Sequence, residues 1–191
     1  MREVTLPDLA AFTRCQMTLM LSESWPLVGV QARRAIGRVS RITRTRLAMG
    51  ARLGPSDGEE ARQTRKALAR ATEAAMAGFG ALIWPAVPGD PPRVAKIRAL
   101  DYLRRPMLSV PPNVSGGPAA SVRCGRSKAG FPAAFQVMGR RSGDRAVLKI
   151  AHAYEAATPE FDNPVIETGA NEPAPRADTA RLRCDSPDLR H

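Results

Sequence analysis

A helix with a clear beginning, followed at once by a short apolar run, constrains the fold of this chain most. Ser56 and Glu59 form an S-x-x-E capping box, in which each side chain satisfies a free N–H group of the first turn. Small and apolar residues then recur at helical spacing, at Ala61, Leu68, Ala71, Ala75 and Phe79. We therefore predict a helix over 57–78 with one buried face. The apolar run 81–84, stopped by Pro85, predicts a buried strand of a parallel or mixed sheet.

The rest of the chain divides at its prolines and glycines into further helices and strands. The predicted elements are a strand at 2–6, helices from Asp8 to about Ser24 and at 28–38, 40–53 and 142–157, and strands at 118–123 and 132–138. Asp8 is the predicted N-cap of the first helix, and Pro26 is expected to break it. Residues 85–117 are expected to be mostly loop, with a helical turn near 94–103.

This order of elements predicts an α/β fold built of packed layers. Three or four strands would form only part of a sheet. The length of 191 residues suits one domain, which we place at 1–161. Over 162–191, four prolines, balanced charges and few large apolar residues predict a disordered tail.

The chain is strongly basic, with a net charge of +11, and this raises the question of an anionic partner. Arginine supplies 25 of the 29 basic residues, and these arginines are spread along the whole length. The basic stretch 40–53 is therefore interpreted as a solvated helix face, and nucleic acid is not an expected partner. The apolar stretch 15–30 contains Glu23 and Pro26 and falls short of the roughly 20 apolar residues of a membrane span, so no membrane partner is expected.

Cysteine and histidine usage predicts neither a metal site nor a cofactor. The cysteines are Cys15, Cys124 and Cys184, and no C-x-x-C pair occurs. Histidine is present only as His152 and His191. The pattern fits a reducing cytoplasm, and residues 1–14 have no apolar core of a secretory signal, so we expect a cytoplasmic protein.

Short motifs follow one another along residues 3–158. They are V-T-L-P with a helix after it, the long helix followed by GALIWPAVPGDPP, then NVSGGPA, GFPAAFQ, the pair Gly139-Arg140, and a closing helix that contains A-x-x-Y-E. In this order and at this spacing they resemble the C-terminal part of amidase-signature enzymes. The resemblance implies a partial amidase-signature fold, with the C-terminal strands of a mixed sheet packed against helices.

The same resemblance implies a function that this chain does not complete. The family hydrolyses amide C–N bonds with a Ser–Ser–Lys triad that lies, with a Gly/Ser-rich loop, in its N-terminal half. We find no GGSSGG-like loop, so we expect the chain to begin after it and to contain no catalytic residue. The implied partners are a small amide substrate in the complete enzyme and the N-terminal half or a complementing subunit. Formation of a homo-oligomer is also considered.

Asn113 and Gln136, from the NVSGGPA and GFPAAFQ motifs, are the candidate substrate-pocket residues. Side-chain amides at such positions either line a pocket or tie loops to strands by hydrogen bonds, and the structural role is the favoured one. Ser115 matches the NVSGGPA loop rather than a nucleophile loop, and Ser127 and Lys128 are neighbours on a turn that point apart. We assign catalysis to none of the three.

Two classes of function follow. The first is the C-terminal segment of an amidase-signature amide hydrolase, inactive without the rest of the enzyme. The alternative is a non-catalytic basic binding or interaction protein, or a partner-dependent subunit, derived from such a segment.

Overall fold

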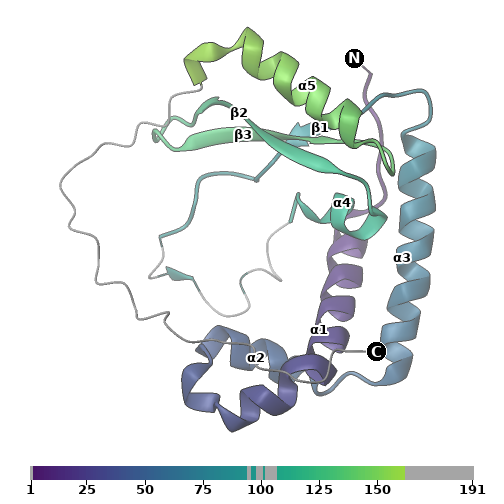
Figure 1. Cartoon of the computed structure of the whole chain (residues 1–191), viewed down its shortest axis with the longest axis vertical. Helices are drawn as coiled ribbons and strands as arrows, with labels where there is room; N and C mark the ends of the chain where they lie inside the picture. Colours follow the sequence, from purple (N-terminus) through teal and green to yellow (C-terminus); the bar gives the residue numbers. More distant parts are fainter. Residues whose placement is uncertain (1, 94–95, 98–100, 102–106, 162–191) are drawn as a thin grey trace, which may run out of the picture.

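The computed structural model describes residues 2–93, 96–97, 101 and 107–161. Its main elements are α1 (Leu9–Arg34), α2 (Arg41–Gly50), α3 (Pro55–Ala75), β1 (Leu82–Pro85), α4 (Val110–Ser115), β2 (Ala119–Arg126), β3 (Pro132–Met138) and α5 (Asp144–Ala157). The sheet and α5 lie at one end and α2 at the other, with α1 and α3 side by side between them (Figure 1). The α/β class is confirmed. The tail predicted at 162–191 and most of the turn predicted near 94–103 lie outside the described residues.

Helix α1 begins where the sequence predicts and continues well past the predicted stop. The Asp8 side chain accepts a hydrogen bond from the Ala10 N–H at 3.0 Å. Pro26 lies inside the helix, is itself exposed, and does not break it. The prediction of a break is wrong because α1 packs against α2, α3 and α4, and this packing offsets the roughly 3 kcal/mol that an interior proline costs. The helix predicted at 28–38 is the end of α1 followed by a 3-10 turn, Ile36–Arg38.

Helix α3 is capped by a different pair from the one predicted. The Gly54 N–H donates to Oδ2 of Asp57 at 2.7 Å, and Pro55 opens the helix. Glu59 instead accepts hydrogen bonds from Arg62 and Gln63 on the next turn. The predicted capping box is therefore wrong by two residues, because Pro55 presets a helical φ and α3 begins there, two residues before the predicted start.

The buried face of α3 agrees with the prediction only in part. Ala61 and Leu68 are buried, whereas Ala71 is exposed and Thr72 takes its place in the core. The Thr72 hydroxyl donates to the Leu68 carbonyl at 2.8 Å, which satisfies the buried hydroxyl. The basic helix predicted at 40–53 is α2, whose N-cap Ser40 accepts from the Thr43 N–H at 3.2 Å.

The three described strands form a sheet in the order β1-β3-β2, and both pairs are antiparallel. The run 81–84 is predicted in a parallel or mixed sheet, and within the described residues its pairing is antiparallel. A register shift between Arg123 and Gly125 bulges β2, where Gly125 has a φ of 126°. Beyond it, Ser127 and Phe131 close the predicted turn into β3.

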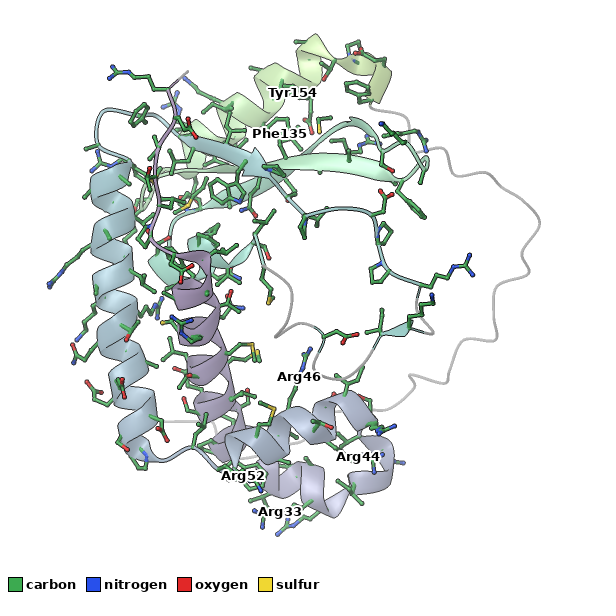
Figure 2. The ribbon with its side chains drawn as sticks, turned by 180° about the vertical axis from the view of Figure 1, so that it is seen from behind. Arg33, Arg44, Arg46, Arg52, Phe135 and Tyr154 are labelled. Carbon is green, nitrogen blue, oxygen red and sulfur yellow. The ribbon has the colours of Figure 1, made fainter. Side chains whose placement is uncertain are left out.

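Helix α5 covers one face of this sheet. Val122 and Val137 from the strands pack with Val147 and Ala151 from the helix. Phe135 and Tyr154 join the same layer edge to face, with ring centroids 4.7 Å apart (Figure 2). The predicted closing helix is thereby confirmed.

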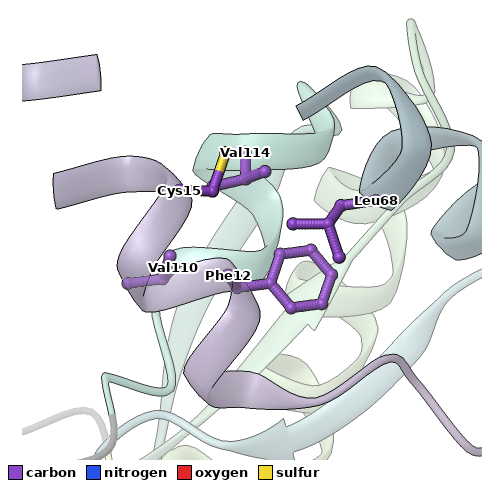
Figure 3. Packing of buried hydrophobic residues seen from close by; sticks show 5 residues of the cluster. All are labelled: Phe12, Cys15, Leu68, Val110 and Val114. Atoms are coloured by element: carbon purple, nitrogen blue, oxygen red, sulfur yellow. The ribbon is translucent and has the colours of Figure 1, made fainter. Parts of the chain in front are cut away.

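Two predictions for irregular segments are wrong. Residues 2–6 form no strand; instead Val4 and Leu6 pack beside the buried cluster of Met76, Leu82 and Met138. Residues 110–115, expected in a loop, form α4, because prolines at its start preset the helical φ and both of its valines enter the core. That core joins α1, α3 and α4 through Phe12, Cys15, Leu68, Val110 and Val114 (Figure 3).

Candidate functional site

The sheet face that turns away from α5 carries Gln136 at its centre. Trp84 on β1 and Ser121 on β2 are the register partners of Gln136 on β3, so the three side chains share one face. Gln136 is 5% exposed, and its Nε2 has no hydrogen-bond acceptor in the described structure. A buried amide donor without an acceptor costs about 1–3 kcal/mol. The site therefore contains a buried, desolvated amide N–H group.

Trp84 connects this face to α4. Its indole Nε1–H donates to the Leu108 carbonyl at 2.9 Å, and neighbouring Met107 packs against the α1–α3–α4 core. The bond holds the segment that enters α4 against the sheet. A half-buried tryptophan needs a partner for its N–H, but the sequence does not say that Leu108 provides it.

Asn113 occupies a different environment from Gln136. It lies on the exposed side of α4, where its Nδ2–H donates to Oε1 of Gln16 on α1 at 3.3 Å. The structure thus separates the two predicted pocket residues: Gln136 is buried in the sheet, and Asn113 links two helices at the surface. Gln16 was missed by the sequence analysis, although its spacing from Phe12 places it on the flank of the buried face.

The NVSGGPA segment joins α4 to β2 through a close backbone contact. Gly116 ends α4 with a φ of 77°, and its N–H donates to the Pro112 carbonyl at 2.8 Å. A Cβ on Gly117 would lie 2.5 Å from the Gly139 carbonyl oxygen, and the Gly139 N–H donates to the Pro118 carbonyl. The NVSGGPA motif and the pair Gly139-Arg140, which are distant in the sequence, are therefore in direct contact.

Arg140, next to Gly139, extends this junction to α3. Its Nε–H donates to Oε1 of Glu73 at 2.7 Å. The ion pair is about half exposed, so it contributes little to stability, and its main effect is to link the segment after β3 to α3.

The two serines near the site differ in their hydrogen bonding, since the buried Ser127 hydroxyl has no partner in the described structure. The Ser115 hydroxyl donates to the Pro111 carbonyl at 2.8 Å, as at many helix ends. Ser127 sits in the β2–β3 turn, and Lys128 beside it is exposed.

Two titratable groups outside the sheet face, Cys15 and Glu59, have pKa values displaced by their surroundings. Burial raises the pKa of the Cys15 thiol, against a smaller opposing effect of Arg65, and its Sγ–H donates to the Ala61 carbonyl. Hydrogen bonds from Arg62 and then Gln63 lower the pKa of the Glu59 carboxyl. Among the described residues, no three His, Cys, Asp or Glu side chains gather into a possible metal site.

Across 2–93, 96–97, 101 and 107–161, no helix has both the length and the apolar character that a bilayer crossing demands.

Known proteins resemble this chain over most of its described part. The Amidase family matches residues 30–148. A glutamyl-tRNA(Gln) amidotransferase subunit of Pseudothermotoga lettingae is 35% identical over 101 residues, which is 52% of this chain and 21% of that protein. The corresponding subunit of Brevibacillus brevis is 31% identical over 99 residues, 51% of this chain and 20% of that protein. The matched region thus spans about a fifth of the length of these curated relatives.

Solved structures show the same fold. A crystal structure of an amidase matches with a TM-score of 0.73 and 24% identity, over 82% of this chain and 37% of that one. A bacterial aryl acylamidase of the amidase-signature family matches with a TM-score of 0.70 and 18% identity, over 90% of this chain and 39% of that one. Because the family match covers more than half of the residues and the fold agrees, this chain belongs to the amidase-signature family.

Proposed function

We propose that this chain is the C-terminal segment of an amide hydrolase, in which it builds part of the sheet and one wall of the acyl pocket. The family match supports this role, because residues 30–148 include β1, α4, β2 and β3. In the complete enzyme, the Ser–Ser–Lys triad would lie in a portion that precedes these elements. The 191 residues by themselves would be inactive.

The observation that carries the proposal is the buried amide of Gln136. Amide hydrolysis needs an activated serine and donors already in place for the developing oxyanion. It also needs groups that orient the acyl part of the substrate. The Nε2–H of Gln136, which is buried and has no acceptor in the described structure, is suited to a substrate carbonyl or carboxylate oxygen. Asn113, exposed on α4 and bonded to Gln16, stays a separate candidate for substrate contact, outside the buried face that holds Gln136.

The partners of this function would be a small amide and the N-terminal half of the enzyme, on the same chain or as a complementing subunit. The curated relatives are named as subunits of glutamyl-tRNA(Gln) amidotransferase, so membership of such an assembly is the more specific form of the proposal. Self-association through uncovered apolar surface would also be expected of the isolated segment. We place the protein in the cytoplasm on its cysteine usage.

The first test is complementation. The 191-residue chain is expressed alone and together with an N-terminal portion that carries the Lys and the Gly/Ser-rich loop, and hydrolysis of simple amides is measured. We expect activity only from the pair. A monomeric chain that unfolds cooperatively and hydrolyses amides without its complement would overturn the proposal.

A second test assigns the role of Gln136 within the active pair. Gln136→Met keeps the length of the side chain and removes the donor, so we expect KM to rise about three- to tenfold with kcat less affected. Gln63→Met, which changes an exposed glutamine on α3 that bonds Glu59 of the same helix, is the matched control and should leave KM unchanged. An unchanged KM in Gln136→Met would restrict this residue to a structural role.

The alternative function, a basic binding protein without catalysis, is favoured by one cleft. Between α3, α4 and the segment after β3, a cavity of about 380 Å³ is lined by basic side chains, among them Arg65, Lys66, Arg70 and Arg141. Electrostatic binding of nucleic acid there would fall steeply with salt. Absence of binding to single- or double-stranded nucleic acid at low salt would exclude this alternative.

A further inference from the structure

A second cleft lies at the opposite end of the molecule from Gln136, between the last turns of α1 and helix α2. Its volume is about 380 Å³, within the roughly 300–1,000 Å³ of small-molecule sites. Its apolar walls come from both helices and the residues just after them, and are formed by Trp25, Ala32, Ile36, Leu47, Ala48 and Ala51.

Two glycines shape this cleft. The Trp25 indole lies across Gly29, where a Cβ would come within 2.6 Å of Cε3 of the ring. At Gly50 a Cβ would collide with the Leu21 carbonyl, so α2 approaches α1 along its backbone. The side chains that form the apolar walls are thus carried by two closely packed helices.

Arginines form the polar part of the lining. Arg33, Arg44 and Arg52 line the cleft, and Figure 2 shows them gathered at the α2 end of the molecule. The Arg33 guanidinium stacks on the Trp25 ring, 4.5 Å from its centroid. No Asp or Glu lines the cleft, and the described residues give none of these three arginines a carboxylate partner.

This combination selects one class of ligand. Three positive charges without a carboxylate partner around an apolar cavity disfavour cations, and they bind an anionic oxygen more strongly than a neutral one. Guanidinium groups bind carboxylates in a planar, two-pronged geometry. We propose that the α1–α2 cleft binds a small amphiphilic carboxylate, with its apolar chain against Trp25, Ile36 and Leu47 and its carboxylate held by Arg44 and Arg52.

Decanoate, kept below its micelle concentration, is the probe. Its binding to the 191-residue chain, in the assembly in which the chain is purified, is measured by calorimetry. Decanol and decyltrimethylammonium keep the chain length without the negative charge, and butyrate keeps the charge without the long chain. Vesicles of phosphatidylglycerol test whether an anionic lipid surface is the true ligand. A decanoate carrying a diazirine on its alkyl chain maps the site by photolabelling.

We expect decanoate to bind about tenfold or more tightly than each of the three control compounds, and the photolabel to appear on α1 and α2. Arg44→Gln and Arg52→Gln should each weaken decanoate binding about tenfold, because each removes a charge-assisted hydrogen bond. Arg34→Gln, which changes an exposed arginine outside the cleft, should leave it unchanged. Ala48→Phe, which fills the cleft and keeps every charge, should abolish binding.

Four results would overturn the inference. These are equal binding of decanol and decanoate, binding to vesicles only, equal effects of Arg34→Gln and Arg44→Gln, and photolabelling outside the two helices. Unchanged binding in Ala48→Phe would likewise move the ligand away from this cleft. None of these results depends on amide hydrolysis, so the cleft is tested independently of the proposed function.

Discussion

At the scale of single residues, Gly117 and Gly139 allow close contacts of the backbone because neither residue has a side chain. Gly117 lies against the Gly139 carbonyl, where a Cβ would come within 2.5 Å of the oxygen. Gly139 also has no room for a side chain, since a Cβ there would lie 2.7 Å from Cγ2 of Val147 on α5. These contacts fix the ends of β2 and β3 relative to each other, and so fix the register that places Gln136 beside Trp84.

Gly117→Ala should therefore destabilise the chain. The added methyl group meets a backbone oxygen, which cannot move aside, and overpacking of this kind costs about 1–3 kcal/mol. Gly80→Ala is the control, because a Cβ there meets nothing within 4 Å and the residue does not have a positive φ. We expect Gly80→Ala to be neutral or stabilising by up to about 1 kcal/mol in urea unfolding. Equal losses from the two substitutions would show that the contact at Gly117 does not matter.

The buried thiol offers a second residue-scale prediction. Burial raises the pKa of Cys15, so the folded chain keeps this thiol protonated at a pH where an exposed thiol ionises. Since only the thiolate reacts readily, iodoacetamide at pH 8–9 should alkylate half-buried Cys124 well before Cys15, as read by peptide mass spectrometry. As pH rises past about 9, the unfolded thiol loses its proton first, and the contribution of Cys15 to stability is lost. Faster labelling of Cys15 would contradict its burial.

At the scale of elements, α1 shows how packing overrides a local signal. Its buried residues, among them Phe12, Cys15 and Leu21, face partners that are distant in the sequence. Pro26 is exposed, so its ring needs no room in the core. The helix thus tolerates the proline at a local cost and ends only at Arg34.

Pro26→Ala should remove that cost. Alanine restores the missing N–H and is more favourable than proline in a helix interior by about 3 kcal/mol. The substitution also makes the unfolded chain more flexible, which lowers the free energy of unfolding by less than about 1 kcal/mol. We expect a net gain of about 2 kcal/mol in the free energy of unfolding, with more helix by circular dichroism. Leu27→Ala, at a neighbouring residue that is 72% exposed, serves as the neutral control. A loss of stability in Pro26→Ala would mean that the proline is needed for the shape of α1.

At the scale of the whole molecule, apolar surface is left exposed in several places. Within the described residues β1 and β2 each pair with a neighbouring strand on one side only. Large apolar side chains are exposed on α1, β1 and α5, including Leu27, Ile83 and Leu148 at 72%, 51% and 64%. Surface of this kind marks places where other parts of a protein or other chains dock.

The isolated chain is therefore expected to self-associate. Size-exclusion chromatography with light scattering should give a mass above the 20.6 kDa of the chain, and Leu27→Lys combined with Leu148→Lys should shift it toward the monomer. Lys128→Arg, a change on an exposed turn that keeps the charge, should leave the distribution as it is. A monodisperse 20.6 kDa species from the unchanged chain would contradict this expectation.

Local signals in the sequence determined a large part of this fold. Turn residues and apolar spacing predicted β3 at 132–138 and the basic helix α2, and Asp8 was identified as the N-cap of α1. The order of short motifs also placed the chain in its family. These features depend on residues within a few positions of one another, where propensity, capping and spacing act directly.

Tertiary structure decided what no local signal contains. It carried α1 through Pro26, folded 110–115 into a helix, and kept 2–6 out of the sheet, because contacts between distant segments outweigh local preference. It also buried Gln136 while leaving Asn113 at the surface, although both are amides in motifs of the same family. The α1–α2 cleft likewise forms only because Gly50 lets the two helices approach each other. The sequence does not show that contact, so the basic stretch 40–53 was interpreted as a solvated helix face.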